Sequence, residues 1–442
     1  MFISESEKVE SNKGKWDNKE MTLYEVKILF LKLKQNYIPN NGSDKEFCML
    51  ANGFWQAEGY IGGIFRSGFN FYPLCTATQL FSKESAYFFI RLNNALDNKG
   101  IFNITINNFG KFVIHYRLSG WDTFLNVFIP YFYMLYGAKY QAILKLKKIF
   151  ELKTNLKDSD ELIKVLLISI AYSLTPHKSR YKLDLKEKLI SLNLDTNLLK
   201  KLPQFNYGDN KVHPSFLFIL GFFLGDGTLH LKLEWKDKNS TIVIIPLFNI
   251  IQSNVESNRI IMEIITNYLV GIGIKASLWE SSTIISVTVK GIDNIFKGLL
   301  PFFIKYSYFL YWKKDSFNLL TWTHRLINDG GHHTYLGLNL LINKIYYSVN
   351  ERFTDKEVWI ERLNNWLKKA SSRRVSGELY ISPIYKSNKE IRGWQVRFPS
   401  TLKIPKSNKA FMFSTLGGED KALYSAIKYR DNIISDWINT YK

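Results

Sequence analysis

The sequence predicts an α+β protein built from two copies of one fold, followed by a small C-terminal unit of three strands and a helix. Residues 43–152 show the pattern of a helix, two alternating strands, a helix, more strands and a further helix. The same pattern returns over residues 213–350. Matching residues recur in the same order in both copies, so an accidental match is improbable.

The composition excludes several classes of protein. The chain has 442 residues, and its 59 Lys and Arg against 39 Asp and Glu give a formal net charge of +20. Such an excess favours a polyanionic partner, and nucleic acid is the leading candidate. With 46% hydrophobic residues the chain is too apolar for a disordered basic tail. Cys48 and Cys75 are too few for a disulfide framework or a four-thiolate zinc site.

The segments outside the two copies carry simpler patterns. Residues 22–35 predict one helix in a polar N-terminal extension, and residues 158–200 predict an amphipathic helix, a Lys-rich loop and a second short helix. The longest uncharged apolar stretch, residues 123–138, is shorter than the ~18–20 residues of a membrane span, so we expect no membrane association. The N-terminal residues carry acidic side chains and no apolar core, so we expect neither a secretory signal nor an organelle presequence.

The clearest repeat is a nonapeptide that ends an apolar helix. It is ANGFWQAEG in the first copy and ILGFFLGDG in the second. Gly53 with Ala57, and Gly221 with Gly225, place small residues four positions apart on a helix, which lets two helix backbones approach closely. Since glycine weakens a helix, two in one helix need a packing reason. We therefore expect the two helices to pack side by side about a pseudo-twofold axis.

An acidic residue lies near the end of each nonapeptide, Glu58 in the first copy and Asp226 in the second, an offset of 168 residues. The helix dipole disfavours an anion at a helix C-terminus unless a cation is bound there. Side-by-side helices would bring both carboxylates together, and oxygen ligands suit Mg²⁺. Metal ions held in this way polarise a phosphodiester and activate water.

Two further positions recur. The sequence Gly-X-Asp precedes Pro130 in the first copy and Pro301 in the second by the same interval, and Gln79 and Gln252 each end an apolar strand. On these residues the chain resembles the LAGLIDADG homing endonucleases in their single-chain, two-motif form, over roughly residues 44–350. The resemblance implies an αββαββα fold in each half, with saddle-shaped antiparallel sheets that straddle a long DNA site.

The resemblance also implies an activity and its residues. It implies cleavage of both DNA strands across the minor groove with 3′ overhangs, by a monomer of internal pseudo-twofold symmetry that uses Mg²⁺ or Mn²⁺. By position, Glu58 and Asp226 would be the metal ligands, and Gln79 and Gln252 would lie beside the scissile phosphates.

Two lysines match those of the family's peripheral basic pockets, namely Lys139 and Lys314, with Lys313 open as an alternative to Lys314. The first motif departs from the family consensus by Glu in place of Asp, and by Asn52 and Gln56 within the helix.

Strand periodicity predicts the DNA-contacting faces. In residues 228–235 leucines alternate with polar residues, and residues 111–118 and 284–290 alternate in the same way. Such faces mix donors, acceptors and cations, which the reading of base edges and phosphates requires. The predicted DNA-contacting residues of the two halves are Arg66, His115, Arg117, His230, Lys232, Ser286, Thr288 and Lys290.

The C-terminal residues 373–442 predict strands at 378–385, 393–399 and 409–414 and a helix at 419–440. This order, with the strand GWQVRF, resembles the DNA-binding domain of plant ethylene-response factors. The resemblance implies that Arg392, Trp394 and Arg397 contact the major groove. The alternative is a structural appendage. The sequence SSRRVSG before it predicts a linker between independent cores.

These expectations combine into one organisation and one function. The predicted segments are an N-terminal extension (1–43), a first half (44–157), a helical connector (158–203), a second half (204–350), a linking helix (351–372) and a basic C-terminal domain (373–442). We expect an intron-encoded, site-specific DNA endonuclease that acts on double-stranded DNA.

Two other functions remain open. One is a maturase that binds intron RNA, and the other is a DNA-binding protein that does not cleave. Acids in both motifs favour cleavage. An abundance of Phe, Tyr, Asn, Ile and Lys indicates an A+T-rich gene, which favours a mitochondrial origin over a chloroplast.

Overall fold

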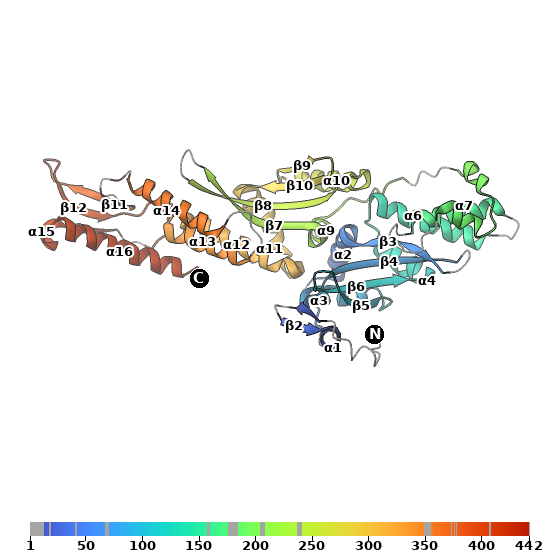
Figure 1. Cartoon of the computed structure of the whole chain (residues 1–442). Coiled ribbons are helices and arrows are strands. Elements are labelled where there is room, and N and C mark those ends of the chain that lie inside the picture. Colours follow the sequence, from blue (N-terminus) through green and yellow to red (C-terminus); the bar gives the residue numbers. More distant parts are fainter. Residues whose placement is uncertain are drawn as a thin grey trace. The chain divides into compact units, whose positions relative to one another are not determined.

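The structure is a computed structural model that describes most of the chain. The described residues are 13–16, 19–39, 42–66, 70–156, 160–175, 184–203, 208–236, 241–348, 355–372, 374, 376, 378–405 and 408–441, with the backbone alone at 13–16 and 347–348. The chain forms two compact units (Figure 1). The first comprises Met1–Thr228, Asn249–Val289 and Pro301–Lys313, and the second comprises Leu229–Phe248, Lys290–Leu300 and Lys314–Lys442.

The first copy has the predicted αββαββα order. Its elements are α2 (Asp44–Glu58), β3 (Tyr60–Phe65), β4 (Phe71–Leu80), α3 (Lys83–Ala95), β5 (Ile101–Ile106), β6 (Phe112–Ser119), α4 (Trp121–Thr123), η2 (Phe124–Phe128), α5 (Ile129–Tyr131) and α6 (Gly137–Thr154). The four strands form one antiparallel sheet in the order β3-β4-β6-β5. The α+β class predicted from the sequence is confirmed.

The second copy repeats this order. Its elements are α9 (Phe216–Asp226), β7 (Gly227–Lys236), β8 (Thr241–Ser253), α10 (Glu256–Gly271), β9 (Ala276–Glu280), β10 (Ile284–Lys290), η5 (Asp293–Leu299) and α11 (Leu300–Lys305). The strand order β7-β8-β10-β9 matches that of the first sheet position by position. Side chains alternate along β7 as the sequence predicts, since Leu229, Leu231 and Leu233 are buried and the residues between them are not.

The helix predicted near the N-terminus contributes to the core of the first half. Strands β1 (Lys13–Trp16) and β2 (Lys19–Thr22) precede the predicted helix, α1 (Leu23–Gln35). Thr22 and Glu25 form a capping box that fixes where this helix begins. Phe30 of α1 is buried against Phe81 and Phe102. Helix α1 therefore packs against the first half.

The connector contains the predicted amphipathic helix, α7 (Glu161–Ser173), followed by α8 (Leu185–Ile190) and η3 (Thr196–Lys201). The carbonyl oxygen of Leu174 accepts hydrogen bonds from the Tyr60 hydroxyl at 2.7 Å and the Gly63 backbone N–H at 3.2 Å. These bonds attach α7 to the edge strand β3. The predicted Lys-rich loop falls on residues 176–183, outside the described residues.

The C-terminal residues form the predicted three strands and helix. The elements are α12 (Lys314–Asn328), η8 (Gly331–His333), α13 (Tyr335–Ser348), α14 (Lys356–Ser372), β11 (Ile381–Tyr385), β12 (Ile391–Val396), β13 (Lys409–Met412), α15 (Phe413–Leu416) and α16 (Glu419–Asn439). The three strands pair antiparallel in the order β11-β12-β13. Helix α16 buries Ala422 and Ala426 in a core shared with Trp394, Val396 and Phe411.

The C-terminal sheet and helix have a buried core of their own, and hydrogen bonds join them to α12 and η8. Trp322 of α12 donates from Nε1 to the carbonyl oxygen of Tyr441 at 2.8 Å. The Tyr441 hydroxyl donates to Asp329 at 2.7 Å, and the Tyr380 hydroxyl donates to the carbonyl oxygen of His333 at 2.7 Å. The end of the chain is therefore packed on α12 and η8.

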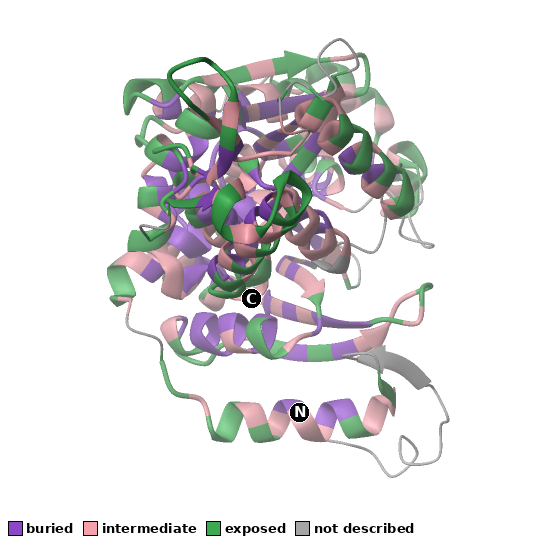
Figure 2. Ribbon diagram, turned by 90° about the vertical axis from the view of Figure 1, so that its left-hand side faces the viewer, coloured by how far each residue is buried: buried purple, intermediate pink, exposed green. Residues whose placement is uncertain are grey.

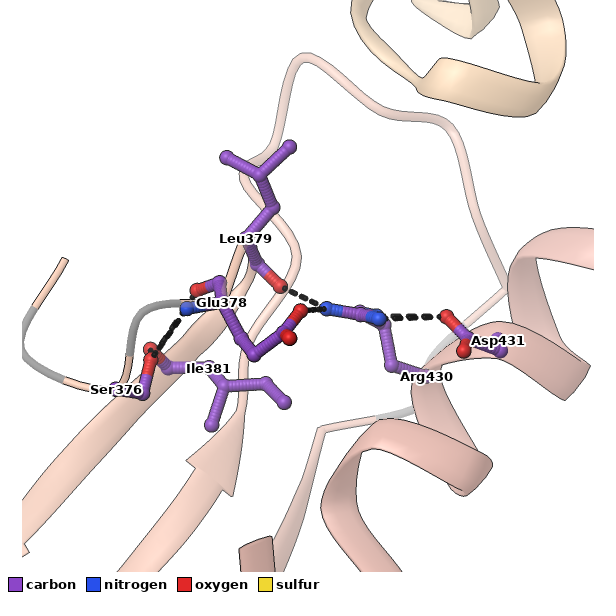
Figure 3. A network of polar contacts seen from close by, with 6 residues as sticks. All are labelled: Ser376, Glu378, Leu379, Ile381, Arg430 and Asp431. Carbon is purple, nitrogen blue, oxygen red and sulfur yellow. Dashed lines mark hydrogen bonds and ion pairs between the residues drawn. The ribbon is translucent and has the colours of Figure 1, made fainter. Parts of the chain in front are cut away.

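Arg430 secures α16 to the chain that enters β11 (Figure 3). Its guanidinium donates to the Glu378 carboxylate at 2.7 Å, to the Leu379 carbonyl oxygen at 3.1 Å and to Asp431 at 2.8 Å. The side chain of Arg430 is largely buried, so these contacts compensate its charge.

Figure 2 shows where the buried residues lie; they alternate along β4, β7 and β8, whereas in α9 every residue from Phe216 to Leu224 is buried. Among the described residues, no helix has both the length and the apolar character needed to cross a membrane.

Candidate active site

Helices α2 and α9 lie against each other at their small residues (Figure 1). A Cβ atom added at Gly53 would overlap the carbonyl oxygen of Phe218, and one added at Gly221 would overlap that of Leu50. Farther along, a Cβ at Gly225 would come within 2.5 Å of the Ala57 Cβ. No side chain fits between the two backbones at these positions. The helices consequently reach their C-terminal ends together.

The two acids meet at those ends. Glu58 is the last residue of α2 and Asp226 the last of α9, and both are half-buried. Burial raises the pKa of Glu58 above its usual range, and the neighbouring charge of Asp226 raises it further. Burial also raises the pKa of Asp226. Each acid therefore lies in a partly desolvated position where an added cation would be favourable.

Lys139 binds the end of α2. Its ammonium donates to the carbonyl oxygens of Trp55, Gln56 and Ala57 at 2.9, 2.6 and 3.0 Å. Carbonyls of the last helical turn lack the backbone partners of interior ones, so this lysine adds a donor to each of the three; that of Trp55 also accepts from the Gly59 backbone N–H at 2.8 Å. The residue is partly exposed, but its ammonium is buried, and burial lowers the pKa of Lys139 to about 7 against the attraction of both acids.

Lys313 is the corresponding cation beside α9. Its ammonium donates to the carbonyl oxygen of Gly227 at 2.7 Å, and burial lowers its pKa, again opposed by Asp226 and Glu58. Lys313 ends the short turn η7 (Tyr311–Lys313), whereas Lys314 begins α12 with an exposed side chain. The structure therefore corrects the assignment of Lys314. Successive residues of a helical turn point about 100° apart, so two adjacent lysines cannot both face the acids.

The two glutamines differ in what they contact. Gln252, near the end of β8, donates from Nε2 to the Asp226 carboxylate. Gln79, near the end of β4, accepts a hydrogen bond at Oε1 from the backbone N–H of Leu80 at 2.9 Å. The two glutamines at matching positions therefore make different hydrogen bonds. Gln252 bonds its acid, and Gln79 bonds the backbone of the next residue.

The two amides that depart from the consensus have structural partners. Asn52 accepts from the Met134 N–H at 2.9 Å and donates to the Tyr131 carbonyl oxygen at 2.9 Å, and Gln56 accepts from the Tyr136 N–H at 2.9 Å. These buried bonds hold the segment that leads into α6, the helix that carries Lys139. Local sequence patterns predict no role for Asn52 or Gln56, since both depend on a segment some 80 residues away.

The residues at this centre fit a divalent cation. Glu58 and Asp226 supply hard oxygen donors; burial raises the pKa of both, and the charge of Asp226 raises that of Glu58 further, so a cation bound between them would stabilise their charged forms. Among the described residues, no group of three or more His, Cys, Asp and Glu side chains could hold a metal. The remaining ligands would come from backbone carbonyls, water or substrate.

Solved structures share this architecture. I-SmaMI bound to an uncleaved DNA target in the presence of calcium ions matches with a TM-score of 0.53 and 20% identity, covering 67% of this chain and 97% of that one. I-LtrWI bound to target DNA matches with a TM-score of 0.53 and 17% identity over 70% of this chain and 99% of that chain. The chain has the LAGLIDADG homing endonuclease fold.

A third match is the LAGLIDADG meganuclease I-CpaMI bound to uncleaved DNA, with a TM-score of 0.52 and 20% identity, covering 69% of this chain and 99% of that one. No family model and no curated protein matches the sequence. These matches span nearly the whole of each neighbour, so about three tenths of this chain is additional to the LAGLIDADG fold as they contain it.

In the first half of this LAGLIDADG fold, the polar face of the sheet is organised around His115. Its ring nitrogens lie 3.1 Å from the Thr78 hydroxyl and 2.8 Å from the Thr105 hydroxyl. Burial lowers the pKa of His115, so at neutral pH it contributes hydrogen bonding and no charge. Arg117 pairs with Thr76 across β4 and β6, and Arg66 is exposed with its guanidinium over the Tyr72 ring.

In the second half of the LAGLIDADG fold, Lys232 of β7 is exposed and bonded to Glu234 at 2.7 Å, and His230 is partly buried. Lys290 is exposed at the end of β10. Within the same strand Thr288 donates to Asn249 at 3.0 Å.

One predicted contact in β10 is corrected. Ser286 is only 5% exposed and pairs with Trp279 of β9, a residue that is 54% exposed. Alternation predicts the side of a sheet, but it does not reveal which polar residues are covered by larger neighbours. Ser286 is therefore not available as a surface contact, whereas Trp279 is.

The C-terminal unit requires a second correction. Trp394 is 3% exposed and packs in the core under α16, so it does not face a groove of DNA. The side chain of Trp394 lies on the face of the sheet that α16 covers. Arg392 and Arg397 are exposed. Arg392 lies at an irregularity where β11 and β12 shift register.

Proposed function

We propose that this chain is a site-specific DNA endonuclease that makes a metal-dependent double-strand break at a long target, encoded within an intron of an organelle genome. The observation that carries the proposal is the convergence of Glu58 and Asp226 at one end of the α2–α9 interface, beside Lys139 and Lys313. The neighbours I-SmaMI and I-LtrWI, which share the fold, are described as bound to DNA targets.

Glu58 and Asp226 would hold Mg²⁺ or Mn²⁺, which when bound supplies polarisation of the phosphodiester and activation of water. Lys139 holds the end of α2, and Lys313 holds the junction of α9 and β7. Both add positive charge beside the acids. Gln252 fixes the orientation of the Asp226 carboxylate by donating to it. In this proposal two acids and two cations lie where the DNA backbone would react.

The DNA would be bound by the polar strand faces and by the overall positive charge. Arg117, Arg66 and Lys232 supply cations for phosphates, while His115 and its two threonines supply donors and acceptors. In the C-terminal unit, Arg392 and Arg397 would contact duplex outside the cleavage site. The abundance of residues encoded by A+T-rich codons supports a mitochondrial gene.

The test is cleavage of defined DNA by the purified protein. A library of genomic fragments that includes intronless junctions is incubated with the protein and Mg²⁺, and cut ends are sequenced. We expect one dominant long site with staggered ends, and no cutting by the Glu58→Gln, Asp226→Asn double variant. Cutting at no site, or equal cutting by the double variant, would overturn the proposal. Selective binding of intron RNA without cutting would favour a maturase.

A further inference from the structure

Asn258, in the first turn of α10, contacts the glutamine that holds Asp226. Its Nδ2 lies 3.3 Å from Gln252 Oε1, 3.1 Å from the Ser253 carbonyl oxygen and 3.0 Å from the Ser253 hydroxyl oxygen, so its two N–H groups are shared among three acceptors. Gln252 in turn donates from Nε2 to the Asp226 carboxylate. A chain of hydrogen bonds therefore runs from the start of α10 to the acid.

The chemistry of each group sets the direction of this chain. An ionised carboxylate only accepts, so Asp226 requires the NH₂ end of the Gln252 amide. The Ser253 carbonyl also only accepts, so Asn258 must present its own NH₂ group on this side. That NH₂ group meets the oxygen of Gln252. If the Gln252 amide turned over, its oxygen would face the Asp226 carboxylate and its NH₂ group would face that of Asn258. Both hydrogen bonds would then be lost.

The first half lacks this arrangement at the matching positions. Gln79 corresponds to Gln252, and at the same spacing Ser85 corresponds to Asn258 and Ser82 to Val255. Ser82 and Ser85 form a capping box at the start of α3, and Ser85 donates to the Leu80 carbonyl oxygen at 2.8 Å.

In the second half this cap is absent, and Asn258 makes other hydrogen bonds. Val255 occupies the N-cap of α10 and makes no side-chain cap hydrogen bond. Asn258 therefore contributes no capping box. It bonds the end of β8 and the amide of Gln252.

We infer that Asn258 is a positioning residue that fixes the amide of Gln252 toward Asp226, so that the two acids of the centre are held differently. The inference rests on the proposed nuclease function for its kinetic consequence. Because only the Asp226 side has this support, loss of Asn258 unbalances the two strand cleavages. The step it affects is the placement of Asp226, with no change in DNA binding.

The kinetic test uses the intact protein and a duplex labelled separately on each strand. Asn258→Leu keeps the size of the side chain and removes its donors. We expect about a tenfold fall in the maximal rate for one strand, because the Gln252 amide would no longer be held in its bond to the charged Asp226 carboxylate, with the half-saturating DNA concentration unchanged. Nicked product should accumulate with the break always in the same strand. The matched variant Ser85→Ala should leave the balance between strands as it is.

Coupling shows whether Asn258 acts through Gln252. In a Gln252→Ala background, Asn258→Leu should cause no further loss, because the amide it positions is absent. Additive losses in the double variant would overturn the inference. If Asn258→Leu does not fold, Asn258→Asp serves instead, since its carboxylate would attract the Gln252 NH₂ group away from Asp226 and should give the same strand imbalance.

A readout without activity separates this inference from the proposed function. In metal-free protein labelled with ¹⁵N-glutamine, the side-chain resonance missing from Gln252→Ala identifies Gln252. We expect Asn258→Leu to shift that resonance and speed its exchange with water, while Ser85→Ala does not. An unchanged resonance overturns the inference even if the protein cuts DNA. A shifted resonance in a protein that cuts nothing supports the inference and rejects the nuclease.

Discussion

The two halves of the active centre share a fold and differ in their polar contacts. Lys139 donates to three carbonyls at the end of α2, whereas Lys313 donates to one at the start of β7. Gln252 bonds Asp226, whereas Gln79 accepts from the backbone of its neighbour. The first half is thus held mainly through its cation and the second through its amide. A repeated motif can therefore build a centre whose two sides are supported unequally.

The largest effect is expected from the acids themselves. Glu58→Gln or Asp226→Asn should abolish double-strand cleavage with Mg²⁺, because each removes one of the two charged oxygen ligands. DNA binding should stay within about tenfold, since affinity comes chiefly from phosphate contacts. Gel-shift titration and strand-specific cleavage assays measure the two quantities. If either single variant cut both strands normally, that acid would have no role in the chemistry.

The next effect concerns the shared helix interface. Gly53→Leu and Gly221→Leu each force a side chain into a backbone carbonyl of the facing helix, with overpacking costs of roughly 1–3 kcal/mol or more. Both should lower the melting temperature, and cleavage should fall with it. Gly271→Leu in α10 is the control, because a Cβ there meets no atom within 4 Å. Equal melting temperatures for all three variants would contradict the close packing of α2 and α9.

The two lysines should differ in how they link stability to pH. The pKa of Lys139 falls from 10.5 to about 7 on folding. Between these values the unfolded chain holds a proton that the folded protein has released. The free energy of unfolding therefore rises with pH across this window, by at most ~1.4 kcal/mol per pH unit. Below pH 7 the full cost of the buried charge is present.

Replacing each lysine with methionine removes its part of that dependence. Urea unfolding of metal-free protein is measured at about pH 6.5 and about pH 9.5. The free energy of unfolding should be clearly larger at the higher pH for wild type, and this increase should be much smaller for Lys139→Met. Lys313→Met should have a lesser effect, because its ammonium is less buried and its pKa is lowered less. Identical pH dependence in wild type and Lys139→Met would show that the ammonium is not desolvated.

The smallest effect is expected from the C-terminal sheet. Arg392→Ala with Arg397→Ala should weaken DNA binding without moving the cut. The slope of log K against log salt should become shallower by roughly 0.9 for each phosphate that the variant no longer neutralises. Lys421→Ala, an exposed charge on α16, is the matched control. Equal salt slopes and footprints for all three proteins would leave the sheet without a role in DNA binding.

Much of this molecule follows from patterns within the sequence. The repeated nonapeptide predicts the shared interface, because small residues four apart let two helix backbones approach closely. The repeated order of helices and alternating strands predicts the α+β class. Alternation in residues 228–235 predicts the buried face of β7, since the side-chain period of a strand is two. These properties depend on neighbours close in the chain.

Other features were decided only by tertiary packing. The sequence left Lys313 and Lys314 as alternatives, and it placed Trp394 and Ser286 on contact surfaces although both are buried. It gave no sign that Trp322 of α12 would bond the carbonyl oxygen of Tyr441, 119 residues away. In each case the outcome depends on which distant element covers a side chain.

The same limit applies to the polar bonds of the centre. Gln79 and Gln252 occupy matching positions, and their contacts differ because Ser85 caps α3 while Asn258 reaches Gln252. The small residues and acids of the repeated nonapeptide predicted that the two acids would converge, and the family resemblance implied a glutamine beside each. Only the folded structure determined their partners, because a hydrogen bond forms over about 3 Å and depends on side-chain orientations that local periodicity does not specify.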